Sequence, residues 1–333
     1  MTTLPRDTRI HDLLAVPVDK YDLAWLQESL QVAVELELST LPPYLCGYWS
    51  CQDPSSAAAQ LILSVILQEM LHMGLAANIL TSISGTPAIN TRVPKYPGAL
   101  PGGVMPDLTV YLGGLTKDYI DDVYMKIEYP ESGPLTPPPT EETIGQFYDA
   151  ISVALGQVSP VFTGNNQMQA TIGENSLTPV KSLGDAQAAI SEIKEQGEGT
   201  STSPDDGDGS ELAHYYRFGE IYNGALLVQV NGNWQYAGAP VPFPATYPMA
   251  PVPEGGWPKP PPNVASLLQQ FDAAYSSIID GLQAAWENGS QSDLGKAIGE
   301  MFTLSGPAVQ LMQIALPGGG GNYGPDFVYT PST

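Results

Sequence analysis

The sequence predicts a mostly α-helical protein, a bundle of helices joined by long loops, and three observations support this fold class. Residues 20–45 and 57–84 contain long runs without proline or glycine, with apolar residues at helical spacing. The 32 prolines and 34 glycines gather between the expected helices and mark long loops. Strand-like character at residues 226–230, followed by NGNW and QYAG, predicts only a small hairpin.

Proline and glycine also set the limits of the other expected elements. The stretch PVPFPATYPMAPVPEGGWPKPPP cannot be helical, because proline lacks the backbone donor that a helix needs. We expect a single domain over residues 20–328, preceded by a flexible segment at 1–19 and containing inserted loops at 86–114, 197–209 and 231–262. Further helices are expected at residues 115–128, 141–156, 184–196 and 210–223, with two additional C-terminal helices at about 263–288 and 292–315.

Composition and charge narrow the classes of function. The 333 residues include 35 acidic and 12 basic ones, for a net charge of −23. A chain this acidic is repelled by nucleic-acid phosphates and by anionic membrane surfaces, so we expect neither as a partner. No apolar run reaches the roughly 18 residues of a membrane span, and the first residues lack the pattern of a secretory signal. With Cys46 and Cys51 interpreted as free thiols just past the first helix, we expect a cytoplasmic protein.

The first expected helix carries a glutamate on its apolar face. Glu37 lies seven residues after Leu30 and seven before Tyr44, on one apolar stripe, whereas Glu35 falls on a polar face and is expected to be largely solvated. A buried carboxylate costs several kcal/mol unless it is paired, protonated or bound to a cation. Glu37 is therefore either a metal ligand or a salt-bridged or protonated core residue.

Two Glu-x-x-His pairs use two of the three histidines in the chain. Glu69 and His72 lie on the apolar face of the expected helix at 57–84, and Glu211 and His214 lie in ELAHYYRFGEI, which is also expected to be helical. Spacing of three residues on a helix places a carboxylate beside an imidazole, where both can bind one ion. With Glu37 on a third helix, the two pairs approximate the ligand set of a ferritin-like bundle. Such ligands suit iron, manganese or zinc rather than calcium.

The second half of the chain offers further candidates at less regular spacing. Glu195 and Glu198 stand before a polar insert, and the glycines beside Glu198 allow its carboxylate to turn either toward a site or to solvent. No carboxylate lies centrally in the helix at 141–156, so the sequence leaves open whether one or two ions are bound. Arg217 either neutralises ligand carboxylates, holds a substrate carboxylate or forms a surface ion pair. Tyr44 is either a residue of the site or plain core.

Several segments, taken in order, resemble one known family: AVELELSTLPPYL, QEMLHMGLAANIL, TIGQFYDAI, EIKEQGEGT and ELAHYYRFGEIYNG. They are similar to the ferritin-like domain of iminophenyl-pyruvate dimer synthases, enzymes of bisindole pathways such as violacein and rebeccamycin biosynthesis. The resemblance spans roughly residues 20–328 and implies an iron-dependent oxidative step on an amino-acid-derived imine. Those enzymes are longer and multidomain, so a different substrate is compatible with the resemblance. The metal ligands that it implies are Glu37, Glu69, His72, Glu198 and His214, with Glu211 as a further candidate.

These inferences lead to one expected function and two alternatives. We expect a non-haem iron oxidoreductase that acts with O2 or peroxide on a small organic substrate, with one or two iron ions and with Arg217 and Tyr44 as catalytic residues. Iron is favoured over manganese and zinc, and the chain is expected to act as a homo-oligomer or beside a pathway enzyme. The alternatives are a non-catalytic metal-binding accessory protein and a zinc hydrolase that uses a free carboxylate as its base.

Overall fold

Two long antiparallel helices, α2 (Leu23–Ser50) and α3 (Ala57–Ser82), form the centre of the protein in the computed structural model, which describes residues 9–206, 209 and 211–331. Each helix begins at a side-chain cap, from Asp22 and Ser56 respectively, which satisfies a backbone amide of the first turn. By length and composition alone α3 could cross a membrane, but 78% of that stretch is buried inside the protein. It is the central helix of a core.

Helix α2 is longer than the sequence predicts, because it continues through Pro42 and Pro43 to Ser50. Proline leaves a helix carbonyl without its usual amide donor. The Tyr96 hydroxyl donates to the carbonyl of Ser39, 2.6 Å away, which is the acceptor that the amide of residue 43 would otherwise use. The helix therefore reaches past Cys46, and Cys46 and Cys51 are both buried free cysteines, as expected.

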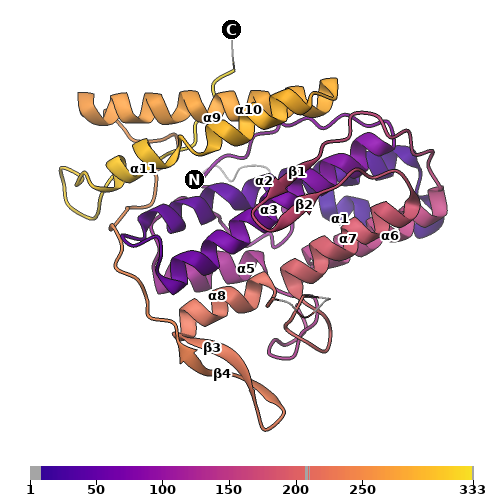
Figure 1. Cartoon of the computed structure of the whole chain (residues 1–333), viewed down its shortest axis with the longest axis horizontal. Coiled ribbons are helices and arrows are strands. Elements are labelled where there is room, and N and C mark those ends of the chain that lie inside the picture. Colours follow the sequence, from indigo (N-terminus) through magenta and orange to yellow (C-terminus); the bar gives the residue numbers. More distant parts are fainter. Residues whose placement is uncertain (1–8, 207–208, 210, 332–333) are drawn as a thin grey trace.

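Three layers are visible in Figure 1, with α2 and α3 in the middle. One outer layer contains α6 (Ile144–Val158), α7 (Leu183–Glu198) and α8 (His214–Asn223). Beside α8 lies a compound turn made of α4 (Lys117–Tyr119), the π-helical turn η3 (Ile120–Tyr124) and α5 (Met125–Ile127). The single helix predicted at 115–128 is thus three short pieces, and the helix predicted from residue 210 begins only at His214.

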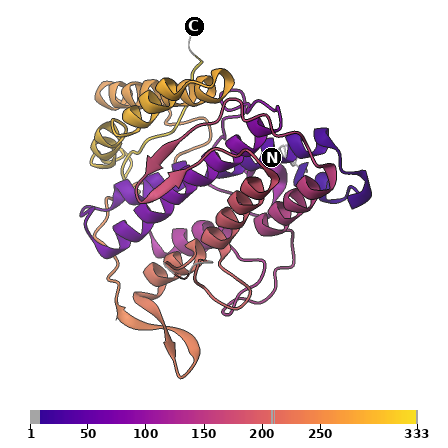
Figure 2. The ribbon, with the colours of Figure 1, turned by 45° about the vertical axis from the view of Figure 1, so that its right-hand side comes forward.

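The other outer layer is C-terminal and consists of α9 (Pro262–Asn288), α10 (Gln291–Met301) and α11 (Ser305–Met312). The expected helix at 292–315 is interrupted at residues 302–304, so three helices stand where two were predicted. Figure 2 shows this layer on the face of the α2–α3 pair opposite α6–α8.

Two antiparallel hairpins complete the architecture. The expected one pairs β3 (Ala225–Val230) with β4 (Asn233–Pro240), with Val228 opposite Gln235 and a bulge near Ala225. A second hairpin, which the sequence analysis did not identify, pairs β1 (Ala170–Ile172) with β2 (Asn175–Leu177).

The N-terminal segment covers part of α2. From residue 9, the segment expected to be flexible forms α1 (Arg9–Leu14) and a 3-10 turn, η1 (Val18–Lys20), and α1 packs near a second such turn, η2 (Pro101–Gly103). The prediction that Glu35 is largely solvated is wrong, because Arg9 of α1 covers it. Glu35 is 5% exposed, with Arg9 Nη2 2.5 Å from Oε2 and Gln31 Nε2 3.1 Å from Oε1.

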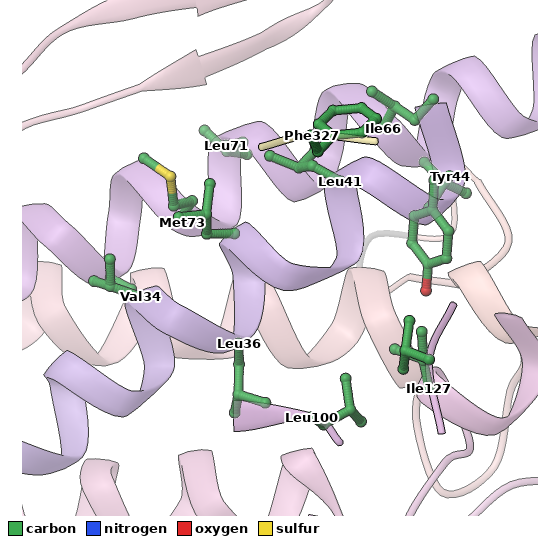
Figure 3. Packing of buried hydrophobic residues seen from close by; sticks show 14 of the residues in the cluster. Val34, Leu36, Leu41, Tyr44, Ile66, Leu71, Met73, Leu100, Ile127 and Phe327 are labelled. Carbon is green, nitrogen blue, oxygen red and sulfur yellow. The ribbon is translucent and has the colours of Figure 1, made fainter. Parts of the chain in front are cut away.

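The hydrophobic core lies on both faces of the α2–α3 pair. Figure 3 shows Leu41 and Met73 on one side of the pair, whereas Tyr44 points to the other side, toward Ile127 of α5. The two faces bury different chemistry. The side that faces α9 is mainly apolar, and the side that faces α5–α8 contains the cluster of buried carboxylates and histidines described next.

Candidate metal centre

Five side chains that can bind a metal converge between α2, α3 and the α5–α8 layer. They form two groups, Glu37/Glu69/His72 and Glu69/Glu128/His214, and within each group one ligand atom per residue lies within 4.8 Å of the others. Glu69 belongs to both groups. All five residues are buried, with at most 7% exposure. Each long helix contributes through its inner face, α5 ends directly before Glu128, and α8 begins at His214.

The Nδ1 atoms of both histidines face the carboxylates. His72 Nδ1 lies 3.7 Å from Glu37 Oε2 and 3.7 Å from Glu69 Oε1. His214 Nδ1 lies 2.8 Å from the same Glu69 oxygen and 3.5 Å from Glu128 Oε2. The two rings are nearly parallel, with centroids 5.4 Å apart. The arrangement therefore offers two adjacent ligand sets, with the Glu69 carboxylate between them.

A hydroxyl group holds each of the three carboxylates by one oxygen and leaves the other oxygen facing a histidine. Thr40 and Tyr44 lie on the same face of α2 as Glu37, at helical spacing, and Tyr148 comes from α6. Burial is the largest cause that raises the pKa of both tyrosines well above 10, so they act as donors. The hydroxyl–carboxylate pairs are Tyr148 with Glu37, Thr40 with Glu69 (2.7 Å) and Tyr44 with Glu128 (2.5 Å).

The electrostatics of the cluster call for a cation. Burial raises the pKa of Glu37 and of Glu128, and the charge of Glu69 raises both further. Burial also acts to raise the pKa of Glu69, but its contacts with His214 and His72 outweigh burial and lower that pKa to about 2. Three carboxylates that crowd together away from water repel one another, and a metal ion relieves that repulsion.

The imidazoles respond to the same environment in opposite directions. Burial lowers the pKa of His72 to about 4, which favours the neutral ring that a metal requires. For His214, burial acts in the same direction but the carboxylates of Glu128 and Glu69 outweigh it, and the pKa is raised.

One buried atom supports the fit of these residues to a metal. Nδ1 of His214 makes no hydrogen bond of acceptable geometry, although Glu69 Oε1 is only 2.8 Å away. Buried polar atoms normally have a partner. Two metal ligands can lie this close together without a hydrogen bond between them, because both atoms point toward the ion. The donor set of carboxylates and imidazoles suits iron, manganese or zinc.

Glu211, predicted as a possible ligand, lies outside both groups. Since α8 begins at His214, Glu211 precedes the helix and the spacing of three residues does not bring the two side chains together. Its side chain is 48% exposed and accepts from Arg217 Nη2 (2.9 Å) and Gln68 Nε2 (3.1 Å). Arg217 is itself buried, and its guanidinium also donates to Ser64 Oγ and the Leu212 carbonyl. These contacts direct Arg217 to Glu211 and away from the carboxylates of the centre.

Glu198, the other predicted ligand from the second half, lies at the edge of the centre. Its carboxylate accepts the backbone amides of Glu131 (2.9 Å) and Gly145 (2.8 Å), and it lies outside both ligand groups. Burial is the main cause that raises its pKa to about 7. A Cβ atom on Gly145 would lie 2.4 Å from Glu198 Oε1, so only glycine allows this contact.

The fourth ligand-bearing element, which the sequence analysis did not find, is the compound turn that ends at Glu128. A regular helical wheel fails there because the π-helical turn at Ile120–Tyr124 shifts the register. The sequence does contain one signal for Glu128. It lies four residues after Tyr124, a large residue that is completely buried, and on a helix that spacing places both side chains on the same face.

A cavity of about 30 Å³ adjoins the ligands, enough for one or two water-sized molecules. Its walls include Leu36, Ile127 and Ile144, and it reaches Lys194 and Glu198. Beyond those two residues, a hollow of about 350 Å³ opens between α6 and α7. The centre is thus buried and lies close to a space of the size of a small organic molecule.

Comparison with known proteins places this geometry in a family. A family model described as ferritin-like matches residues 30–223, the part of the chain that contains all five converging ligands. A crystal structure of a ferritin-like protein from Caulobacter vibrioides superimposes with a TM-score of 0.63 at 24% identity, covering 92% of this chain and 97% of that one. That likeness shows the fold alone, and no curated protein matches. Because the family model covers more than half of the chain, the protein belongs to the ferritin-like family.

Proposed function

We propose that the protein is a non-haem iron oxidoreductase that acts with O2 or peroxide on a small organic substrate. The observation that carries the proposal is the pair of ligand groups that share Glu69, each completed by one histidine with Nδ1 directed inward. One iron ion would be held by each group, with Glu69 as a ligand common to both. Two divalent ions would balance the three carboxylates and leave one net positive charge at the centre.

Iron bound there supplies redox chemistry toward O2 or peroxide. The residues around it hold the ligands and the protons in place. Tyr44 and Tyr148 keep their protons at Glu128 and Glu37, so both carboxylates stay oriented in a site that excludes bulk water. This supports a role at the centre for Tyr44, the expected catalytic residue, whereas Arg217 makes its contacts on the far side of His214.

The two cavities support a division between oxidant and substrate. A molecule the size of O2 or peroxide fits the inner cavity of about 30 Å³, and a small organic substrate does not. The outer hollow of about 350 Å³ has that capacity and shares Lys194 and Glu198 with the inner one. We therefore assign the substrate to the α6–α7 hollow. The resemblance to iminophenyl-pyruvate dimer synthases makes an amino-acid-derived imine the substrate class to test first.

Elemental analysis of freshly purified protein is the test of this proposal. We expect about two iron ions per chain, one for each ligand group, and an absorption band that changes when the Fe(II)-loaded protein meets O2. Stoichiometric zinc with no response to O2 would instead indicate a hydrolase, and bound iron that responds to neither O2 nor peroxide would indicate an accessory protein.

Histidine variants supply the matched control. His72→Ala and His214→Ala should each lower the iron content by about one ion, because each removes the only histidine of one group. His11→Ala should retain all iron, since His11 is exposed and pairs with Glu142 on the surface. Full iron content in both ligand variants would contradict the assignment.

A further inference from the structure

We infer that Gln68, Glu211 and Arg217 form a hydrogen-bonded relay that sets the tautomer of His214 and so directs its Nδ1 lone pair to the metal centre. The inference rests on the proposed function in taking His214 as a ligand. The three residues act as positioning residues, because each reaches the centre only through the next.

The direction of the relay is fixed at its outer end. Arg217 can only donate hydrogen bonds, and its guanidinium is held by Ser64 Oγ at 2.9 Å and by the Leu212 carbonyl. Its Nη2 donates to Glu211 Oε2 at 2.9 Å. An ionised carboxylate can only accept. The Gln68 atom that faces Glu211, 3.1 Å away, must therefore be the amide nitrogen Nε2.

The orientation of Gln68 then determines the proton position on His214. With its nitrogen toward Glu211, Gln68 presents Oε1 to His214 Nε2 at 2.9 Å. An amide oxygen only accepts, so Nε2 must carry the hydrogen. In the neutral ring the lone pair then lies on Nδ1, the atom that faces Glu69 and Glu128.

Burial makes the alternative orientation costly. Gln68 and Arg217 are each 3% exposed and His214 is fully buried, so water has little access to these groups. Turning the Gln68 amide over would leave its buried oxygen facing the Glu211 carboxylate without a donor, and would require His214 to carry its hydrogen on Nδ1. Each unsatisfied buried group costs roughly 1–3 kcal/mol, which is enough to keep one orientation.

The second histidine provides an internal contrast. His72 Nε2 also faces a glutamine oxygen, Gln196 Oε1 at 2.9 Å. Among the described residues, however, no hydrogen bond joins the Gln196 amide to a carboxylate–guanidinium pair. The locked orientation is therefore a property of the His214 side of the centre.

Nitrogen-15 NMR of the metal-free protein, labelled at histidine, tests the relay through the tautomer of the neutral His214 ring. We expect the wild type to show the Nε2–H tautomer. Gln68→Met removes the acceptor at His214 Nε2, and Glu211→Ala removes the acceptor that holds the Gln68 amide nitrogen, so that the amide can turn over. Both should shift His214 toward the Nδ1–H tautomer, with Glu69 and Glu128 as its acceptors. Glu211→Gln should restore the wild-type tautomer, since its amide oxygen can still accept from both Arg217 and Gln68.

Zinc affinity provides a second measurement on the same proteins. Loss of a group that orients a ligand typically lowers metal affinity about 10- to 100-fold, and we expect this for Glu211→Ala and Gln68→Met. Glu254→Ala, which removes an exposed loop carboxylate, is the control and should bind zinc as the wild type does.

Two outcomes separate this inference from the proposed function. If Glu211→Ala and Gln68→Met keep both the Nε2–H tautomer and the wild-type zinc affinity, the relay is wrong even though the metal centre stands. If the wild type binds neither zinc nor iron, the proposed function fails, and the tautomer measurement still decides whether the relay orients His214.

Discussion

Two regions of this protein bring carboxylates together, one fully buried and the other partly exposed, and they stabilise them in different ways. At the candidate metal centre, Glu37, Glu69 and Glu128 face two histidines. On the opposite side of the α2–α3 pair, Asp272 of α9 lies against Asp326 of the C-terminal segment. Burial is the main cause that raises the pKa of Asp272 to about 8, and the charge of Asp326 adds to it. The aspartate pair therefore shares a proton at neutral pH.

The surroundings of the two clusters explain the difference. The carboxyl group of Asp272 bonds to Asp326 and to the backbone amide of Val328, and no basic side chain contributes to its shift. The centre instead supplies a hydroxyl donor to each carboxylate and turns two Nδ1 atoms inward. Clustered carboxylates are thus not diagnostic of a metal by themselves. Imidazole Nδ1 atoms that face the carboxylates are the feature that distinguishes the candidate metal site from the aspartate pair.

The largest expected effect comes from Glu69→Gln, which removes the shared ligand while keeping the shape of the side chain. Both ligand groups lose a member, so we expect metal affinity to fall by more than about 100-fold, beyond the usual effect of residues that only orient a ligand. Elemental analysis and zinc titration measure it. Asp272→Asn is the matched control from the other cluster and should keep full metal content. Equal metal content in the two variants would remove the contrast between the regions.

Metal should stabilise the protein more at pH 7 than at pH 5. The pKa values of Glu37, Glu128 and His214 are all raised, so protons compete with the metal for these ligands as the pH falls. At a zinc concentration about 1,000 times the Kd, binding stabilises the folded state by about 4 kcal/mol. Thermal unfolding with and without zinc at both pH values measures the difference. A shift that is equal at pH 5 and pH 7 would exclude these groups as ligands.

A smaller effect of pH is expected at the aspartate pair. Because the pKa of Asp272 in the folded protein, about 8, exceeds its ordinary value of 3.8, the unfolded chain loses this proton first as the pH rises. The contribution of this pair to the free energy of unfolding is therefore fully present below about pH 4, and it declines as the pH rises toward 8. Asp272→Asn keeps a donor toward Asp326 and removes that decline.

We expect Asp272→Asn to be more stable than the wild type by about 1 kcal/mol at pH 8, a modest value because solvent screens this partly exposed pair. Urea unfolding at pH 4 and pH 8 measures it, with no gain at pH 4. A variant that is less stable than the wild type at pH 8 would show that Asp272 is ionised in the folded protein.

The smallest effect is expected for Glu198→Gln. Two backbone amides hold its carboxylate outside both ligand groups, so the metal content should not change. Elemental analysis beside Glu69→Gln provides the comparison. Loss of one ion would show instead that Glu198 is a ligand, as the resemblance to the dimer synthases implies.

Much of the site follows from local periodicity. Glu37, Glu69 and His72 lie on long regular helices, where the apolar stripe shows which face is buried. Glu211 and Glu128 lie where that regularity fails. The first precedes a helix that starts three residues later, and the second follows a π-helical turn that changes the register. Short irregular elements take their geometry from their neighbours, so a helical wheel misplaces them.

By itself, the sequence determined that the protein is a helical bundle and that Glu37, Glu69 and His72 lie on the buried faces of its long helices, because regular spacing of apolar residues depends only on the local chain. Tertiary structure alone decided the partner of each buried charge. Glu35 and Glu37 are both 5% exposed on one helix, yet Arg9 of a distant segment covers the first, and the second faces His72. Such partners come from residues far apart in the chain, and only packing brings them together.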